Sequence, residues 1–129
     1  MRSRSSVRSA ALLIVIAVVL STCDSSPTSP NGPAQTAIVN LLDNNTFSPS
    51  TVTIVAGGTV TFVNLGGDHN VTANDGSFRC ANGCDGSGGD GDPATNAWSV
   101  TIMFPNARSV PYNCEVHVSI GMTGTVIVQ

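Results

Sequence analysis

The chain has 129 residues, enough for one domain, and 41% of them are hydrophobic. Three of its five basic residues lie within the first 22 residues, whereas all eight acidic residues come later, so residues 23–129 carry a formal charge of −6. Binding to nucleic acid through its phosphates requires Lys and Arg side chains, so this balance excludes a nucleic-acid partner. The acidity favours either a basic protein partner or simply solubility.

The first 22 residues are predicted to form an export signal. Arg2, Arg4 and Arg8 make a basic start, and an unbroken run of 11 apolar residues follows at 10–20. This run is too short to cross a bilayer, which takes about 20 apolar residues. A basic start, a short apolar run and then small polar residues are typical of a signal peptide. A buried N-terminal helix is the alternative, but no polar pattern marks a helix face here.

Cys23 closes this apolar run and resembles the acylated cysteine in the lipobox of bacterial lipoproteins. The lipobox usually has Gly, Ala or Ser at the position that Thr22 occupies here. The resemblance implies lipidation of Cys23 and a membrane anchor, and the alternative is a soluble secreted protein cleaved nearby. Residues 23–35 are rich in Ser, Pro and Asn, so we expect a flexible tether ahead of a folded domain at 36–129.

The rest of the chain has the pattern of an all-β domain. Short runs of β-branched residues are separated by Gly, Pro, Asn and Asp, and none has a helical period. Val60 and Phe62 alternate with threonines, as in a strand with one buried face. The runs expected to form strands are 37–42, 51–56, 59–64, 69–73, 97–104, 109–114 and 123–129. Seven such strands in one small domain predict a two-sheet sandwich or a barrel.

Some details of this domain can be predicted from single residues. Gly57-Gly58 stands between two of the runs, which predicts a hairpin connection. We expect helix only as a turn within the insert at 74–96. The side chains expected in the core are those of Phe62, Trp98, Phe104 and Ile127.

The insert at 74–96 is rich in Gly and Asp and contains two cysteines. Cys80 and Cys84 are separated by Ala-Asn-Gly, a turn-forming sequence that can bring their Cα atoms within disulfide distance. A calcium site is the alternative, but the loop lacks the glutamate that closes an EF-hand. Its possible oxygen ligands are Asp85, Asp90 and Asp92. We favour a loop closed by a disulfide.

The number of cysteines draws attention to Cys114. If Cys23 carries a lipid and Cys80 pairs with Cys84, Cys114 has no cysteine left to pair with. Thiols outside the cytoplasm tend to be oxidised, so this one needs protection. A bound metal would protect it.

Cys114, His117 and Met122 fall within nine residues, in the stretch YNCEVHVSIGM at 112–122. The one other histidine, His69, stands at the start of a predicted strand. A thiolate, two imidazoles and a thioether suit copper, and His2Cys with a distant Met is the arrangement of blue-copper sites. Cys114 ends one predicted strand and Met122 begins the next, so a single turn would present Cys114, His117 and Met122 at one end of the sandwich. The pattern predicts one type 1 copper ion held by these four residues.

Other metal sites fit these residues less well. Structural zinc sites use closed sets of Cys and His and do not use Met. The binuclear copper centre of respiratory oxidases has two cysteines in one loop with a following His and Met, whereas Asp-Gly-Ser-Gly follows Cys84. A catalytic copper enzyme would need more histidines than the two present.

The chain resembles a cupredoxin of the plastocyanin and halocyanin type. The matching stretches are FSPSTVTIVAGGTVTFVN at 47–64, DHNV at 68–71 and YNCEVHVSIGMTGTVIV at 112–128. The resemblance implies a Greek-key β-sandwich of about seven or eight strands with the four copper ligands named above. It also implies that Asn70 ties the two ligand loops together. The insert with two cysteines departs from the common plastocyanin pattern.

The resemblance implies a monomeric electron carrier rather than an enzyme, cycling between Cu(I) and Cu(II) in the periplasm or at the cell surface. Its expected partners are redox proteins such as cytochromes or membrane oxidoreductases. Val116, Val118 and Ile120 are expected to form an apolar docking patch around the edge of His117, unless they are ordinary loop residues. Two other functions stay open: copper delivery or storage, which calls for a more exposed site, and an interaction module in which copper is incidental.

Overall fold

A computed structural model describes residues 32–129, so the predicted signal peptide, Cys23 and most of the tether lie outside the described residues. The described part contains ten strands and one 3-10 helix. The elements are β1 (Ala34–Leu42), β2 (Thr46–Ser48), β3 (Thr51–Asn64), β4 (Val71–Ala73), β5 (Arg79–Ala81), β6 (Gly83–Asp85), β7 (Gly88–Gly89), β8 (Trp98–Phe104), β9 (Arg108–Asn113), η1 (Val118–Ile120) and β10 (Thr123–Val128). Within this range, no helix has the length and apolar character needed to span a membrane.

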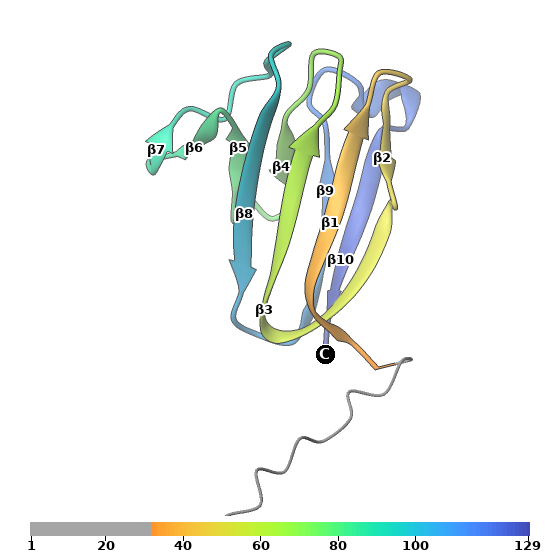
Figure 1. Ribbon diagram of the computed structural model, residues 1–129, viewed down its shortest axis with the longest axis vertical. Coiled ribbons are helices and arrows are strands. Elements are labelled where there is room, and N and C mark those ends of the chain that lie inside the picture. The colour runs from red at the N-terminus through yellow and green to blue at the C-terminus, as the bar shows by residue number, and fades with distance from the viewer. Residues whose placement is uncertain (1–31) are drawn as a thin grey trace, which may run out of the picture.

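The strands form two layers that share β3 (Figure 1). One layer has the order β2-β1-β3-β8, and the other continues from β3 through β10, β9, β4 and the short strands β5 to β7. Both β1 and β10 run parallel to β3, although neither follows it directly in the chain. Strands that are not consecutive in the chain therefore lie side by side, which agrees with a Greek-key sandwich. The expected all-β sandwich is therefore confirmed.

The predicted hairpin at Gly57-Gly58 is wrong, because β3 runs through both glycines without reversing. Thr51–Ile54 pair with β10 in one layer, and Gly58–Asn64 pair with β8 in the other. Gly57 has φ +80°, and a Cβ atom at Gly58 would stand 2.7 Å from the carbonyl oxygen of Gln35. The two glycines therefore let a single long strand bend from one layer into the other, where an ordinary side chain would clash.

The core lies between the two layers. Phe62, Phe104 and Trp98 are buried as expected. Ile127 is only half-buried, because its neighbours Val126 and Val128 occupy the inward positions of β10. Side chains alternate between the two faces of a strand, so an assignment shifted by one residue reverses inside and outside. The prediction for Ile127 is therefore wrong.

The loops at one end of the sandwich hold the residues of interest. Figure 1 shows the ends of β1 and β3 at the same upper edge as the loop between β9 and β10. That loop contains η1, so the one helical turn of the described residues lies here and not, as expected, in the insert. The insert instead forms β5, β6 and β7, which extend the second layer beyond β4.

Candidate metal centre

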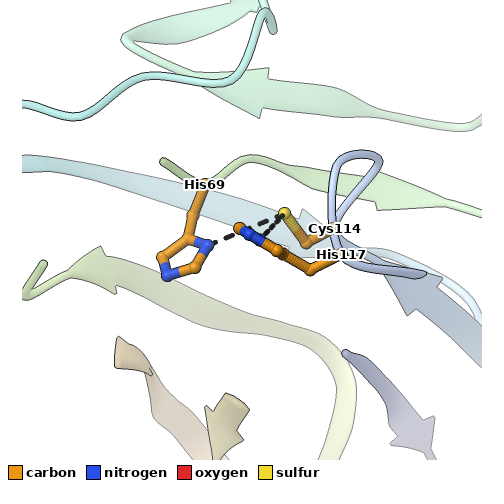
Figure 2. A group of neighbouring side chains, drawn as sticks. All are labelled: His69, Cys114 and His117. Atoms are coloured by element: carbon orange, nitrogen blue, oxygen red, sulfur yellow. Dashed lines mark hydrogen bonds between the residues drawn. The ribbon is translucent and has the colours of Figure 1, made fainter. Parts of the chain in front are cut away.

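Three potential metal ligands meet in the loops at this end of the sandwich, and Figure 2 shows their side chains facing one another. His69 lies just before β4, Cys114 follows β9, and His117 precedes η1. Sγ of Cys114 is 3.8 Å from Nδ1 of His69 and 3.6 Å from Nδ1 of His117. The three ligand atoms lie within 4.8 Å of one another. One thiol sulfur and two imidazole nitrogens therefore face a common point.

Backbone hydrogen bonds close the loop that carries Cys114, His117 and Met122. The Cys114 N–H donates to the Met122 carbonyl at 3.1 Å, and the Met122 N–H donates to the His117 carbonyl at 3.2 Å. The His117 N–H donates to the Cys114 carbonyl, also at 3.2 Å. Gly121 turns the chain here with φ +91°, a conformation that glycine adopts without strain. Met122, the last of the three residues in this loop, is 1% exposed, so its thioether is shielded from water.

His69 is held in one orientation by the strand beside it. Its Nε2–H donates to the carbonyl oxygen of Leu42 at 2.9 Å, which leaves the lone pair of Nδ1 facing Cys114. A Cβ atom at Gly67, where φ is +92°, would stand 2.5 Å from Nε2. Burial lowers the pKa of His69, which favours the neutral imidazole. A metal-binding histidine typically donates its second ring N–H to a carbonyl in this way.

Cys114 is completely buried, and that burial raises the pKa of its thiol. Backbone N–H groups of Asn70, Val116 and His117 act in the opposite direction, because they favour the thiolate. Burial is the larger effect, so the surrounding protein alone favours the protonated form. A bound cation stabilises the thiolate directly. The buried thiol and the neutral imidazole of His69 fit a soft or borderline metal such as copper.

Asn70 joins the two segments that carry the ligands. Its Oδ1 accepts the backbone N–H of Glu115 at 2.9 Å, and its Nδ2 donates to the Glu115 side chain at 2.9 Å and to the carbonyl of Gly91 at 2.9 Å. Asn70 is fully buried and adjacent to His69 in the chain, whereas Glu115 follows Cys114. The side chain thus links the segment before β4 to the segment after β9, the arrangement that the resemblance implied.

Asn64, at the end of β3, has a structural role that sequence reasoning missed. Its Nδ2 lies 3.1 Å from each of three carbonyl oxygens, those of Gly67, Ala94 and Asn96. Asn64 is 1% exposed, so these contacts replace its solvation by water. The only signal in the sequence was an asparagine at the inward position of a strand where an apolar residue was expected. Asn64 fixes the 65–68 loop from which His69 emerges.

The insert is closed as predicted, by a disulfide between Cys80 and Cys84 with an S–S distance of 2.01 Å. Cys114 is the one free cysteine among residues 32–129. Two of the three carboxylates considered as calcium ligands face a cation instead, since Arg79 contacts Asp85 at 3.4 Å and Asp92 at 2.7 Å. These ion pairs support the interpretation as a closed loop without calcium.

The apolar residues of the ligand loop are exposed. The exposed fractions are 47% for Val116, 46% for Val118 and 66% for Ile120. Sequence reasoning did not include Leu65, which is 62% exposed and belongs to the loop that leads to His69. His117 is partly exposed, whereas His69 is completely buried. One of the two imidazoles therefore reaches the surface, and apolar side chains are exposed on its own loop.

Comparison with known proteins identifies the relatives of this chain. The family model described as "Copper binding proteins, plastocyanin/azurin family" matches residues 39–129. The chloroplastic plastocyanin of Tetradesmus obliquus is 37% identical over 84 residues, which span 64% of this chain and 58% of that protein. The plastocyanin of Scenedesmus fuscus is 34% identical over 84 residues, spanning 64% of this chain and 86% of that protein.

A solved structure shares the fold. The purple cupredoxin from Nitrosopumilus maritimus superposes with a TM-score of 0.55 at 22% identity, over 72% of this chain and 99% of that chain. At 22% identity, this similarity supports a shared fold and nothing more specific. The family match covers most of the chain and includes His69, Cys114, His117 and Met122. The chain therefore belongs to the plastocyanin/azurin family of copper-binding proteins, and copper is its cofactor.

Proposed function

We propose that this protein carries single electrons between redox partners, with His69, Cys114, His117 and Met122 as the ligands of one type 1 copper ion. Bound copper supplies the Cu(I)/Cu(II) couple, and the protein supplies the frame. The observation that carries the proposal is the convergence of a buried thiol and two imidazoles within 4.8 Å. Met122 would supply a thioether as the fourth ligand, because its backbone is hydrogen-bonded to both Cys114 and His117.

Hydrogen bonds from the surrounding protein hold the proposed ligands in place. His69 is held by the Leu42 carbonyl, and Cys114 is held by a backbone bond to Met122. Asn70 joins the two ligand segments through the backbone of Glu115. Ligands that are fixed by the fold need little rearrangement when the charge at the site changes by one unit, and this favours fast electron transfer.

Electrons are proposed to enter and leave through the edge of His117. His69, Cys114 and Met122 are buried, so His117 is the one proposed ligand that reaches the surface. Val116, Val118 and Ile120 extend from the same loop and form the proposed docking patch for a short-lived encounter. An Ile120→Ser variant should transfer electrons to a cytochrome more slowly at an unchanged reduction potential. An unchanged rate would assign these residues to an ordinary loop.

The burial of the ligands also separates this function from copper delivery. A delivery or storage protein needs a site that exchanges its metal readily, whereas Cys114 and Met122 are 0% and 1% exposed. A chelator in excess should therefore remove copper slowly from the folded protein. Rapid removal, without unfolding, would favour delivery over electron transfer.

The proposed location is the periplasm or cell surface, with residues 1–22 as signal, Cys23 as lipid anchor and 23–35 as tether. The Cys80–Cys84 disulfide supports an oxidising compartment. Mass spectrometry of the membrane fraction should find an acylated Cys23 at the N-terminus. A soluble product beginning at another residue would refute the anchor.

The deciding experiment for the copper site is a colour measurement. Wild-type protein loaded with Cu(II) should turn intensely blue through charge transfer from the Cys114 thiolate, and Cys114→Ser should abolish the colour. Ser119→Ala, an exposed change in the same loop, should leave the colour intact. A colourless wild type that binds stoichiometric Zn(II) would refute the electron carrier.

A further inference from the structure

The insert contains a cation with three anionic partners. Arg79 is the residue before Cys80, and its guanidinium contacts Asp85, Asp92 and Glu115. The contact with Glu115 is bidentate, with Nε 2.8 Å from Oε1 and Nη2 2.8 Å from Oε2. Bidentate pairs between a guanidinium and a carboxylate are directional as well as strong. The Arg79 side chain is 29% exposed, so the contact is partly shielded from water.

Glu115 connects this cation to the proposed copper ligands. It follows Cys114 directly, and its backbone N–H and carboxylate both bond to Asn70, the neighbour of His69. The insert also reaches Asn70 by a second route, because the Gly91 carbonyl accepts from Asn70 Nδ2, while the Gly91 N–H donates to Asp85. The insert and the two ligand segments therefore share one polar network.

We infer that Arg79 is a positioning residue of the copper centre, and that its ion pair with Glu115 forms a clamp through which the insert holds the Cys114–His117 segment. The inference rests on the proposed function, since it takes His69, Cys114 and His117 as copper ligands. The disulfide at Cys80–Cys84 closes the β5–β6 hairpin that carries Arg79. The insert would then help to position the copper ligands, in addition to forming part of the surface.

The charges of Glu115 and Arg79 should shift the reduction potential of the copper ion in opposite directions. The Glu115 carboxylate favours the more positive, oxidised state of a nearby copper ion, and the Arg79 guanidinium opposes it. Arg79→Gln should therefore lower the reduction potential, and Glu115→Gln should raise it. The double variant should lie between the two single variants. Both groups are partly exposed, so the shifts should shrink as salt concentration rises.

The chain offers a matched control for the loss of an arginine. Arg108 also pairs with a carboxylate, contacting Asp75 at 2.8 Å. It stands at the start of β9, whereas Cys114 follows the end of that strand. Arg108→Gln removes the same charge from the protein without touching the clamp, and its potential should stay near that of the wild type.

The test compares reduction potentials of the copper-loaded wild type, the two single variants, the double variant and Arg108→Gln. Opposite shifts in Arg79→Gln and Glu115→Gln, with Arg108→Gln near the wild type, support the clamp. Shifts of the same sign, or an Arg79→Gln shift no larger than that of Arg108→Gln, overturn it. A wild type that fails to become blue would instead count against the proposed copper site.

A measurement on the metal-free protein separates positioning from charge. The Glu115 N–H donates to Asn70, and Arg79→Gln should make this amide exchange with solvent about two- to fivefold faster, in line with the modest strength of a partly exposed ion pair. Arg108→Gln should leave this amide unchanged. An equal exchange rate in wild type and Arg79→Gln would refute the positioning role.

Discussion

The loop that carries the ligands and the insert at 74–96 lie at the same end of the molecule, yet they are held in different ways. The ligand loop is fixed by backbone hydrogen bonds and by the burial of Cys114 and Met122. The insert exposes most of its residues and is fixed by a disulfide and by the ion pairs of Arg79. A segment with few apolar side chains cannot be held by a core, so covalent and charged contacts hold it instead.

Because the two regions are held differently, substitutions in them should affect different properties of the protein. Damage to the ligand loop should change the copper site, whereas damage to the insert should change stability more than colour. Asn64 joins the insert to the 65–68 loop that leads to the third nitrogen or sulfur ligand, His69, since its amide contacts Gly67 on one side and Ala94 and Asn96 on the other. Variants at these positions therefore test whether the two regions are independent.

The largest effect is expected from Asn64→Ala. It removes the partner of three carbonyl oxygens in a buried setting, which should lower the free energy of unfolding by about 3 kcal/mol. Denaturant unfolding of the metal-free protein measures this loss. Asn96→Ala changes an exposed side chain and is the control, with an expected loss of about 0.5 kcal/mol. Equal losses in the two variants would contradict the bridging role of Asn64.

A smaller effect is expected when the disulfide is removed. Cys80 and Cys84 are only four positions apart, and a loop of this size predicts a loss of about 2 kcal/mol in Cys80→Ser/Cys84→Ser. The blue colour should persist, because neither cysteine is among the proposed ligands. Thermal unfolding and the visible spectrum of the same sample give both results. Loss of colour in a folded double variant would mean that the two regions are not separable.

The smallest effect is expected from Gly67→Ala, which acts on one ligand only. The new Cβ would stand 2.5 Å from Nε2 of His69 and would push the ring away from the Leu42 carbonyl. Loss of such an orienting bond should weaken copper affinity about tenfold, or about 1.4 kcal/mol. Gly76→Ala is the control, because it also has positive φ but no atom lies within 4 Å of its Cβ position. Titration with a competing chelator compares the two.

Much of the fold and the site could be predicted because the signals were local or compositional. The alternating runs predicted an all-β sandwich, and Cys114, His117 and Met122 are close in the chain, so one turn brings them together. Cys80 and Cys84 were predicted to pair for the same reason. The errors arose where packing decided between two local options. Gly57-Gly58 suits a hairpin as well as a bend, and Ile127 suits either face of a strand.

The sequence by itself was enough to predict which kind of metal site this protein has. The thiol, two imidazoles and thioether at family spacing indicate a copper site, since ligand type is a property of side chains and not of their environment. Only the tertiary structure decided what surrounds those ligands. Arg79 and Glu115 are 36 positions apart, and Asn64 and Ala94 are 30 apart. No local pattern relates such residues, because their contact depends on which strands and loops the fold places beside one another at one end of the sandwich.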